Sequence, residues 1–324
     1  MSQRTWFPVL FVLAAALVGA AVGIFLGWLG GDDEPFGHFD NARSVHAAPD
    51  GRLIVADLGT GKNDGRVVAV RPGEAQEVLM SELPSTKNSG QAHSALAGPS
   101  GAAMNAVGVV CTAIGDGPDP GFATMRCSDG LMVDLKAYEQ ANNPDGRAVE
   151  SNPYDIAWDG EAGWVVSDAA ANTVLHVSSK GEVTVLGVFW PADSGLPEGV
   201  PTGLDFGQFA RFRLVAFGLF DAGFGVLDLG RSSPLPDGPA GRPIVGIAQD
   251  RTATSSGELS ACWLEWESAE AGGDLVCNGK FVRSFDRPTG LTQLTKFEYV
   301  VVDAHGLSMV HVDRELFPAT PGGN

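Results

Sequence analysis

The chain has 324 residues with 39 acidic and 21 basic side chains, which gives a formal net charge of −18 at pH 7. A nucleic-acid-binding surface needs a basic patch that releases counterions from the phosphate backbone, so this balance excludes nucleic acid as a partner. The 43 glycines and 20 prolines are typical of many short strands and tight turns, because such turns need a positive φ or a φ held at about −65°. Composition therefore favours an all-β protein.

The N-terminal segment has the composition of a membrane anchor. No charged residue occurs from Trp6 to Leu29, and a helix of that length, rising about 1.5 Å per residue, crosses a hydrocarbon core of about 30 Å. An arginine precedes the segment and acidic residues follow it, so the positive-inside rule keeps the N-terminus cytoplasmic. We expect residues 1–31 to form a short stub and a single transmembrane helix in the inner (cytoplasmic) membrane, followed by a linker over residues 32–43 and a periplasmic/extracytoplasmic domain.

A cleaved signal peptide is the alternative for the same segment. Its apolar core is usually about 7–15 residues long and ends in a small-x-small cleavage site. Here the apolar run ends in Gly27-Trp28-Leu29-Gly30, and a tryptophan suits the membrane interface better than a cleavage site. The sequence favours an uncleaved anchor.

One face of the predicted helix carries only small residues. Ala15, Gly19, Gly23 and Gly27 follow one another at four-residue intervals, which aligns them as a groove that a second helix backbone can approach closely. We expect this face to pack against transmembrane helices of a membrane-protein complex.

A short phrase, proline followed two residues later by glycine or aspartate and then by apolar residues, recurs along the rest of the chain. It occurs as Pro99-Ser-Gly-Ala, Pro153-Tyr-Asp-Ile, Pro201-Thr-Gly-Leu and Pro288-Thr-Gly-Leu, with a degenerate copy at Pro243-Ile-Val-Gly. Spacings of roughly 40–55 residues are typical of four-stranded propeller blades. The sequence predicts a six-bladed β-propeller over residues 44–319, with a helical connector near 134–146 and a flexible tail over 320–324.

Three blades repeat the same strand ending. Apolar runs end in Asp57, Asp168 and Asp303, each followed by a turn-rich segment. An aspartate there caps the turn by accepting hydrogen bonds from backbone N–H groups. Recurrence once per blade favours this structural role, although these carboxylates could also converge at the channel mouth as metal ligands. The sequence therefore predicts a propeller that binds no metal or other cofactor.

Parts of the chain resemble a known propeller family. The run from Leu53 to Arg66, the connector from Asp134 to Pro144, and the stretch from Ser151 to Leu175 look like the ScyD/ScyE type of scytonemin-locus propeller, which is related to the NHL-repeat propellers. The resemblance covers roughly residues 40 to 320 and fades in the fourth and fifth blades. It implies a six-bladed extracytoplasmic propeller and no shared catalytic set.

The four cysteines form two local pairs. Cys111 and Cys127 flank a turn-rich segment, and Cys262 and Cys277 have nearly the same separation within a later blade. Symmetry about the turn places the partners opposite each other on neighbouring strands, and disulfides of this kind persist in oxidising compartments. The spacing lacks the short Cys-x-x-Cys pattern of zinc sites. We expect two cross-strand disulfides.

Sequence motifs for catalysis are missing. The six histidines, His46 among them, are scattered, and no phosphate loop, nucleophile elbow or His-Glu-x-x-His pair occurs. Asn63 and Asp64 lie in a glycine-rich turn that resembles a cation loop but lacks the glutamate of an EF-hand.

The sequence therefore predicts a non-enzymatic, membrane-anchored propeller that serves as a structural subunit of a membrane complex, with a photosynthetic or respiratory assembly as a suitable host and an extracytoplasmic protein partner on the propeller face. Two alternatives remain open. One is a calcium-dependent propeller hydrolase or lactonase, and the other is a periplasmic ligand-binding sensor.

Overall fold

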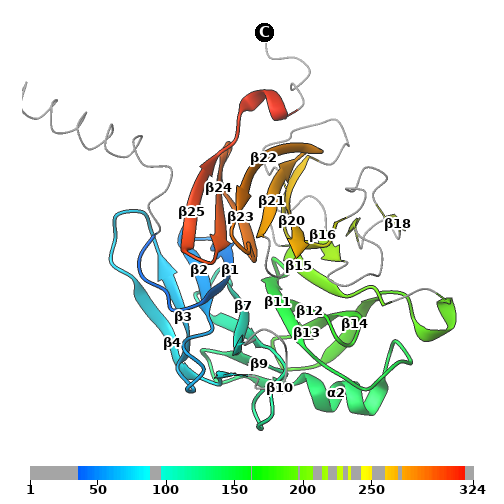
Figure 1. The fold of residues 1–324 in the computed structure, drawn as a ribbon. Helices are drawn as coiled ribbons and strands as arrows, with labels where there is room; N and C mark the ends of the chain where they lie inside the picture. Colours follow the sequence, from blue (N-terminus) through cyan, green and yellow to red (C-terminus); the bar gives the residue numbers. More distant parts are fainter. Residues whose placement is uncertain are drawn as a thin grey trace, which may run out of the picture. The chain divides into compact units, whose positions relative to one another are not determined.

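Figure 1 shows the fold of the chain in a computed structural model. It describes the following residues: 36–87, 96–161, 163–195, 198–206, 214–217, 225–228, 233–234, 242–249, 260–268 and 272–317. The predicted anchor, with Ala15, Gly19, Gly23 and Gly27 on its small face, lies outside these residues, as does the predicted tail. Among the described residues, no helix has the length and apolar character needed to span a membrane.

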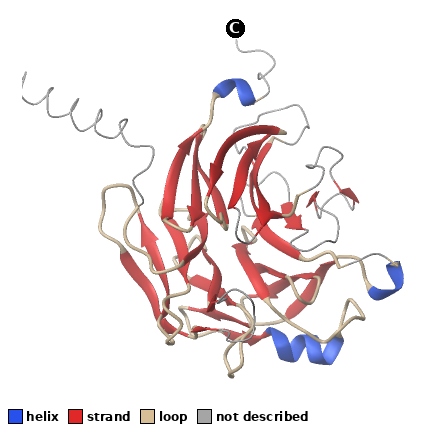
Figure 2. Cartoon of the chain, viewed as in Figure 1, coloured by secondary structure: helices blue, strands red, loops and turns tan. Residues whose placement is uncertain are grey.

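The described chain is almost entirely β-structure, arranged as antiparallel sheets (Figure 2). Five sheets have four strands each. These are β1 (Ala42–Ala47), β2 (Leu53–Asp57), β3 (Gly65–Val70) and β4 (Glu77–Leu83); β7 (Pro99–Met104), β8 (Val110–Ile114), β9 (Thr124–Cys127) and β10 (Met132–Asp134); β11 (Pro153–Trp158), β12 (Gly163–Asp168), β13 (Thr173–Ser178) and β14 (Val183–Val188); β15 (Pro201–Asp205), β16 (Leu214–Phe217), β17 (Gly225–Asp228) and β18 (Ser233–Pro234); and β19 (Ile244–Gln249), β20 (Ala261–Ser268), β21 (Gly272–Cys277) and β22 (Lys280–Phe285).

The remaining strands form smaller sheets. A three-stranded sheet contains β23 (Gly290–Thr295), β24 (Glu298–Asp303) and β25 (Gly306–His311), and a two-stranded sheet contains β5 (Thr86–Lys87) and β6 (Leu96–Ala97). The first strands of the larger sheets neighbour one another in the order β1, β7, β11, β15, β19 and β23, and β23 lies beside β1. These inner strands therefore surround a common axis, as in a β-propeller.

The prediction of six four-stranded blades is wrong in its count, because the structure has five such blades. The residues of the sixth predicted blade form the three-stranded sheet β23–β25. After β25 the described chain continues into a 3-10 helix, Arg314–Leu316, instead of a fourth strand. The outer edge of β25 takes a hydrogen bond from the Phe36 amide to the Leu307 carbonyl, at 3.2 Å. The start of the propeller thus occupies part of the edge that a fourth strand would have used.

Burial explains which strand lies where within a blade. Strand β2 is buried at every position, since inner and middle strands are packed between neighbouring sheets on both faces and read as continuous apolar runs. The outer strands β4 and β14 are largely exposed. One helix, α2 (Leu135–Asn142), lies within the predicted connector and begins where the Asp134 carboxylate accepts a hydrogen bond from the Ala137 amide, at 2.8 Å, a typical N-cap.

Both predicted disulfides are confirmed. Cys111 on β8 is bonded to Cys127 on β9, and Cys262 on β20 is bonded to Cys277 on β21. In each pair the two residues lie directly opposite each other in the antiparallel register. Each bond closes a loop of about 15 residues, which contributes about 3 kcal/mol to the free energy of unfolding by the loop-entropy estimate.

Candidate functional site

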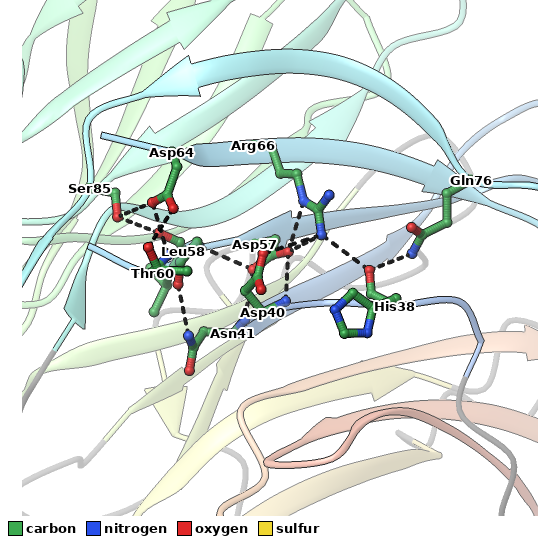
Figure 3. A network of polar contacts seen from close by, with 11 residues as sticks. His38, Asp40, Asn41, Asp57, Leu58, Thr60, Asp64, Arg66, Gln76 and Ser85 are labelled. Atoms are coloured by element: carbon green, nitrogen blue, oxygen red, sulfur yellow. Dashed lines mark hydrogen bonds and ion pairs between the residues drawn. The ribbon is translucent and has the colours of Figure 1, made fainter. Parts of the chain in front are cut away.

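The carboxylate of Asp57 organises the turn after β2 (Figure 3). Its Oδ1 accepts hydrogen bonds from the amides of Asn41 and Gly59, at 2.8 and 3.1 Å. Its Oδ2 accepts from the Arg66 guanidinium, at 2.9 Å from the terminal nitrogen and 3.0 Å from Nε, and from the Asp40 amide at 3.2 Å. Asp57 is completely buried. Every lone-pair direction of this carboxylate is thus used by the blade itself.

The other two repeated aspartates also accept hydrogen bonds from residues of their own blades. Asp168, at the end of β12, accepts from the Asn152 amide at 2.7 Å and from the Ser151 hydroxyl at 2.6 Å. Burial raises the pKa of Asp168 to about 6, against the lowering effect of these hydrogen bonds. Asp303, at the end of β24, accepts from the His305 amide at 2.9 Å, and burial likewise raises its pKa. Each carboxylate therefore binds backbone of its own blade.

The structure does not gather these aspartates into a metal site. Within the described ranges, no three His, Cys, Asp or Glu side chains form a group that could hold a metal ion. The glycine-rich turn that resembles a cation loop is closed by its own contacts, because Asp64 accepts from the amides of Thr60 and Lys62, at 2.9 and 3.2 Å, and from the Thr60 hydroxyl. These hydrogen bonds lower the pKa of Asp64 to about 2.

A small cavity with polar residues in its lining lies on the axis of the ring. All six inner strands contribute to a cavity of about 10 Å³, which we call the axial cavity, and that volume holds about one water molecule. Its lining residues are Ser44, Val45, His46, Ser100, Tyr154, Asp155, Gly203, Leu204, Val245, Gly246, Ile247, Thr289, Gly290 and Leu291.

A histidine–aspartate pair lies in this lining. Nε2 of His46, on β1, is 2.9 Å from Oδ1 of Asp155, on β11, and the two side chains are 15% and 8% exposed. Asp155 also accepts hydrogen bonds from the amides of Ile156, at 2.9 Å, and Leu204, at 3.0 Å. When the His46 Nε2–H donates to Asp155 Oδ1, the neutral imidazole carries its lone pair on Nδ1.

The recurring phrase explains why these residues can meet. In the four regular copies its third residue is Gly101, Gly203, Gly290 or Asp155, and in the degenerate copy it is Val245. A Cβ on Gly101 would lie 2.6 Å from Asp155 Oδ1 and 2.7 Å from Asp155 Cα. The missing side chain on β7 thus leaves room for the carboxylate and for His46 to reach it from β1.

Two hydroxyl oxygens around the axial cavity, those of Ser44 and Thr289, are buried without a hydrogen-bond partner. The Arg43 guanidinium lies over the face of the Tyr154 ring, 4.8 Å from its centroid. Burial raises the pKa of Tyr154, and the positive charge of Arg43 and its hydrogen bond to the phenol partly offset this. The phenol therefore stays protonated at neutral pH and can donate a hydrogen bond.

Sequence reasoning did not select any of these axial residues. His46 was one of several scattered histidines, and Asp155 was one letter of a repeat. A usable signal was present, because the third blade departs from the phrase twice: Tyr154 stands where the other three regular copies have serine or threonine, and Asp155 where they have glycine.

The axial lining does not fit a calcium ion. Calcium takes 6–8 oxygen ligands, usually with several carboxylates. Among the lining residues that the structure describes, Asp155 is the only carboxylate, and both of its oxygens already accept hydrogen bonds from the protein. The chemistry that this lining supports is proton transfer to and from a histidine.

Comparisons with known proteins give a fold and no family. No family model matches the sequence, and no curated protein matches it. Among solved structures, a gluconolactonase from Xanthomonas campestris matches with a TM-score of 0.50 and 13% identity over 86% of this chain and 88% of that chain. The calcium-binding protein regucalcin from Agrobacterium tumefaciens matches with a TM-score of 0.46 and 13% identity over 89% and 88%. At these identities the likeness concerns the propeller fold.

Two predictions change with these findings. The β-propeller is confirmed, but the solved structure that matches with a TM-score of 0.50 is a gluconolactonase, and the relation to the ScyD/ScyE and NHL propellers is not supported. The prediction of a non-enzymatic structural subunit is contradicted, because the matching fold belongs to an enzyme, a gluconolactonase. The regular copies of the repeated phrase report how blades are built, and only the departures from it in the third blade point to the axis.

Proposed function

We propose that this protein is a hydrolase that opens small lactones or esters at the axial cavity, with His46 as the general base. The observation that carries the proposal is the His46–Asp155 pair, 2.9 Å apart, in the lining of a cavity with room for about one water. The fold shared with a gluconolactonase supports a lactone as the first substrate class to test.

The proposed mechanism follows from which ring nitrogen of His46 carries the proton. Asp155 holds the Nε2–H of His46, so Nδ1 accepts a proton from a water molecule as that water attacks the carbonyl carbon of the substrate. The acyl C–O bond then breaks, and the imidazolium returns its proton to the departing alkoxide oxygen. Asp155 orients the ring and stabilises the imidazolium. Water and the lactone are the only reactants, and the product is the hydroxy acid.

An extracytoplasmic location is part of the same proposal. Two cross-strand disulfides support an oxidising compartment, and the net charge of −18 suits a soluble domain. Anchoring by residues 1–31, and packing of their small face against other membrane helices, stay predictions.

The test uses the purified protein and D-glucono-1,5-lactone, with acid release followed by pH-stat and corrected for spontaneous hydrolysis. We expect His46→Gln to lower kcat about 100-fold or more, as loss of a general base does. His176→Gln is the matched control, because His176 pairs with Asp159 at 3.0 Å on the same fold but outside the axial lining.

Chelation separates this mechanism from a calcium-dependent one. We expect the rate to persist in EDTA, since the axial lining does not fit calcium. No hydrolysis of any lactone or ester tested, or equal rates for the wild type and His46→Gln, would contradict the proposal. A rate lost in EDTA and restored by calcium would replace His46 by a metal mechanism.

A further inference from the structure

Three hydroxyl groups occupy the same position of the recurring phrase, directly after its proline, and they differ in their hydrogen bonds. Ser100, on β7, donates to the Pro153 carbonyl of the next blade at 2.7 Å. Thr202, on β15, donates to the Ile244 carbonyl of the next blade, also at 2.7 Å. Thr289, directly before β23, has a buried Oγ1 without a hydrogen-bond partner among the described residues. The sheet β23–β25 thus keeps a hydroxyl that two other blades use to bind their neighbours.

A second unpartnered hydroxyl lies beside this one, where β23 neighbours β1. A Cβ on Gly290 would lie 2.9 Å from the Ser44 Cα and 3.0 Å from the Val45 amide nitrogen, so the chain at Thr289 and Gly290 passes directly against Ser44. Ser44 is 6% exposed, and within the described part of the chain its Oγ also has no partner. Both Ser44 and Thr289 line the axial cavity. Two residues with unused hydroxyls are therefore adjacent at the closure of the ring.

The histidine of the proposed mechanism lies on the same face of β1 as Ser44. Residues 44 to 46 pair with β2 in regular register, and side chains two residues apart in a strand point to the same side. Ser44 and His46 both line the axial cavity, whose volume is about 10 Å³. Because such a cavity is no larger than one water molecule, a water inside it lies against the side chains of the lining.

The other polar side chains of the lining already have partners in the protein. Both oxygens of Asp155 accept hydrogen bonds, the Ser100 hydroxyl donates to a main-chain carbonyl, and the Tyr154 phenol is hydrogen-bonded to a guanidinium. A buried water needs two to four polar partners. A hydroxyl can donate one hydrogen bond and accept others, so Ser44 and Thr289 supply two partners that the fold leaves available.

We propose that the hydroxyls of Ser44 and Thr289 bind one water molecule in the axial cavity and position it as the nucleophile that attacks the lactone carbonyl. This inference rests on the proposed hydrolase. The bound water gives one proton to His46 as its oxygen bonds to the carbonyl carbon, and both hydroxyls stay protonated throughout. The lactone stays outside the cavity, because the water fills it. Ser44 and Thr289 are thus positioning residues for the water.

Kinetics of hydroxyl variants test this role. Thr289→Val replaces the hydroxyl by a methyl group of similar size. We expect it to lower kcat for D-glucono-1,5-lactone about 10-fold, because the nucleophile is no longer held in place, and to leave KM within about twofold, because the lactone does not contact the hydroxyl. Ser44→Ala should act in the same way. Thr289→Ser keeps the hydroxyl and should retain kcat within about twofold of the wild type.

Thr202→Val is the matched control. Thr202 has the same place in the phrase, but its hydroxyl binds the next blade and it lies outside the axial lining. Its loss should lower stability and leave kcat per folded molecule unchanged. An unchanged kcat in Thr289→Val and Ser44→Ala, an equal loss in Thr202→Val, or a loss that Thr289→Ser does not restore would overturn the inference while leaving hydrolysis in place.

A crystal structure of the purified protein separates failure of the inference from failure of the proposed function. We expect electron density for a water within hydrogen-bond distance of Ser44 Oγ and Thr289 Oγ1, and its loss in Thr289→Val. This bound water without hydrolysis of any lactone would retain the water site and reject the hydrolase. Hydrolysis by a protein whose structure has no water on these two hydroxyls would retain the hydrolase and overturn the inference.

Discussion

The Asp57 turn and the axial cavity are both polar and largely buried, yet they treat their polar groups in opposite ways. In the turn, both carboxylate oxygens of Asp57 accept hydrogen bonds from the protein (Figure 3). At the axis, the hydroxyls of Ser44 and Thr289 have no partner. An unpaired buried polar group costs free energy, so the difference separates groups that the fold uses from groups that are available to a ligand.

The largest loss of stability is expected at Asp57, because both of its carboxylate oxygens accept hydrogen bonds from the protein. Asp57→Ala removes the acceptor of Arg66 Nε and of three backbone amides, and we expect it to lower the free energy of unfolding by about 3 kcal/mol. Urea denaturation measures this. Asp50→Ala is the control, because Asp50 pairs with Arg52 while 42% exposed and such surface pairs contribute about 0–1 kcal/mol. Equal losses in the two variants would remove the contrast.

A smaller loss is expected where the two inner strands β7 and β11 approach each other. Gly101→Ala places a Cβ 2.7 Å from Asp155 Cα and from the Ile156 amide nitrogen, both of which are backbone atoms. We expect about 2 kcal/mol of destabilisation, as for other overpacked cores. Gly98→Ala, whose nearest neighbours would lie at 3.3 Å, should cost clearly less. A tolerated Gly101→Ala would show that the carboxylate does not need this space.

Glu139 on α2 extends the comparison to a titrating group. It is 2% exposed, its Oε1 has no partner, and burial, with Asp145 and Asp168 nearby, raises its pKa from 4.5 to about 7. Between these values the folded state holds a proton that the unfolded state has lost, so stability should fall as pH rises through this window and level off above it.

Glu139→Gln should flatten that pH dependence. The measurement is the free energy of unfolding at pH 5 and pH 8 for the wild type and the variant. A reduced slope should remain, since the pKa of Asp168 is also raised, to about 6. An unchanged slope in the variant would assign the effect to other groups.

The smallest effect is expected at the unpaired hydroxyl. Ser44→Ala removes a group without a hydrogen bond, so we expect a change in unfolding free energy of less than about 0.5 kcal/mol. Thr292→Val is the matched comparison, because Thr292 Oγ1 accepts the Ala47 amide at 3.2 Å, and its loss should cost about 1 kcal/mol. A larger loss in Ser44→Ala than in Thr292→Val would place Ser44 among the structural groups.

Local patterns predicted the parts of this protein whose partners lie close in sequence. The strand runs and both disulfides follow from apolar periodicity and from cysteines placed symmetrically about a turn, since each involves neighbouring strands of one blade. The sixth blade was predicted from the same phrase at Pro288 and came out three-stranded. Its edge accepts an amide from Phe36, a residue at the other end of the described chain.

The amino-acid sequence by itself therefore determined an acidic, disulfide-bonded β-propeller. Only the tertiary structure decided what meets on its axis. His46 and Asp155 are 109 residues apart and belong to different blades, so no periodicity connects them. They are neighbours because the inner strands close around one axis and because Gly101, on the strand between them, has no side chain. Because the ring closes, Asp155, which departs from the repeated phrase, lies beside His46 of another blade, and the two form the candidate site.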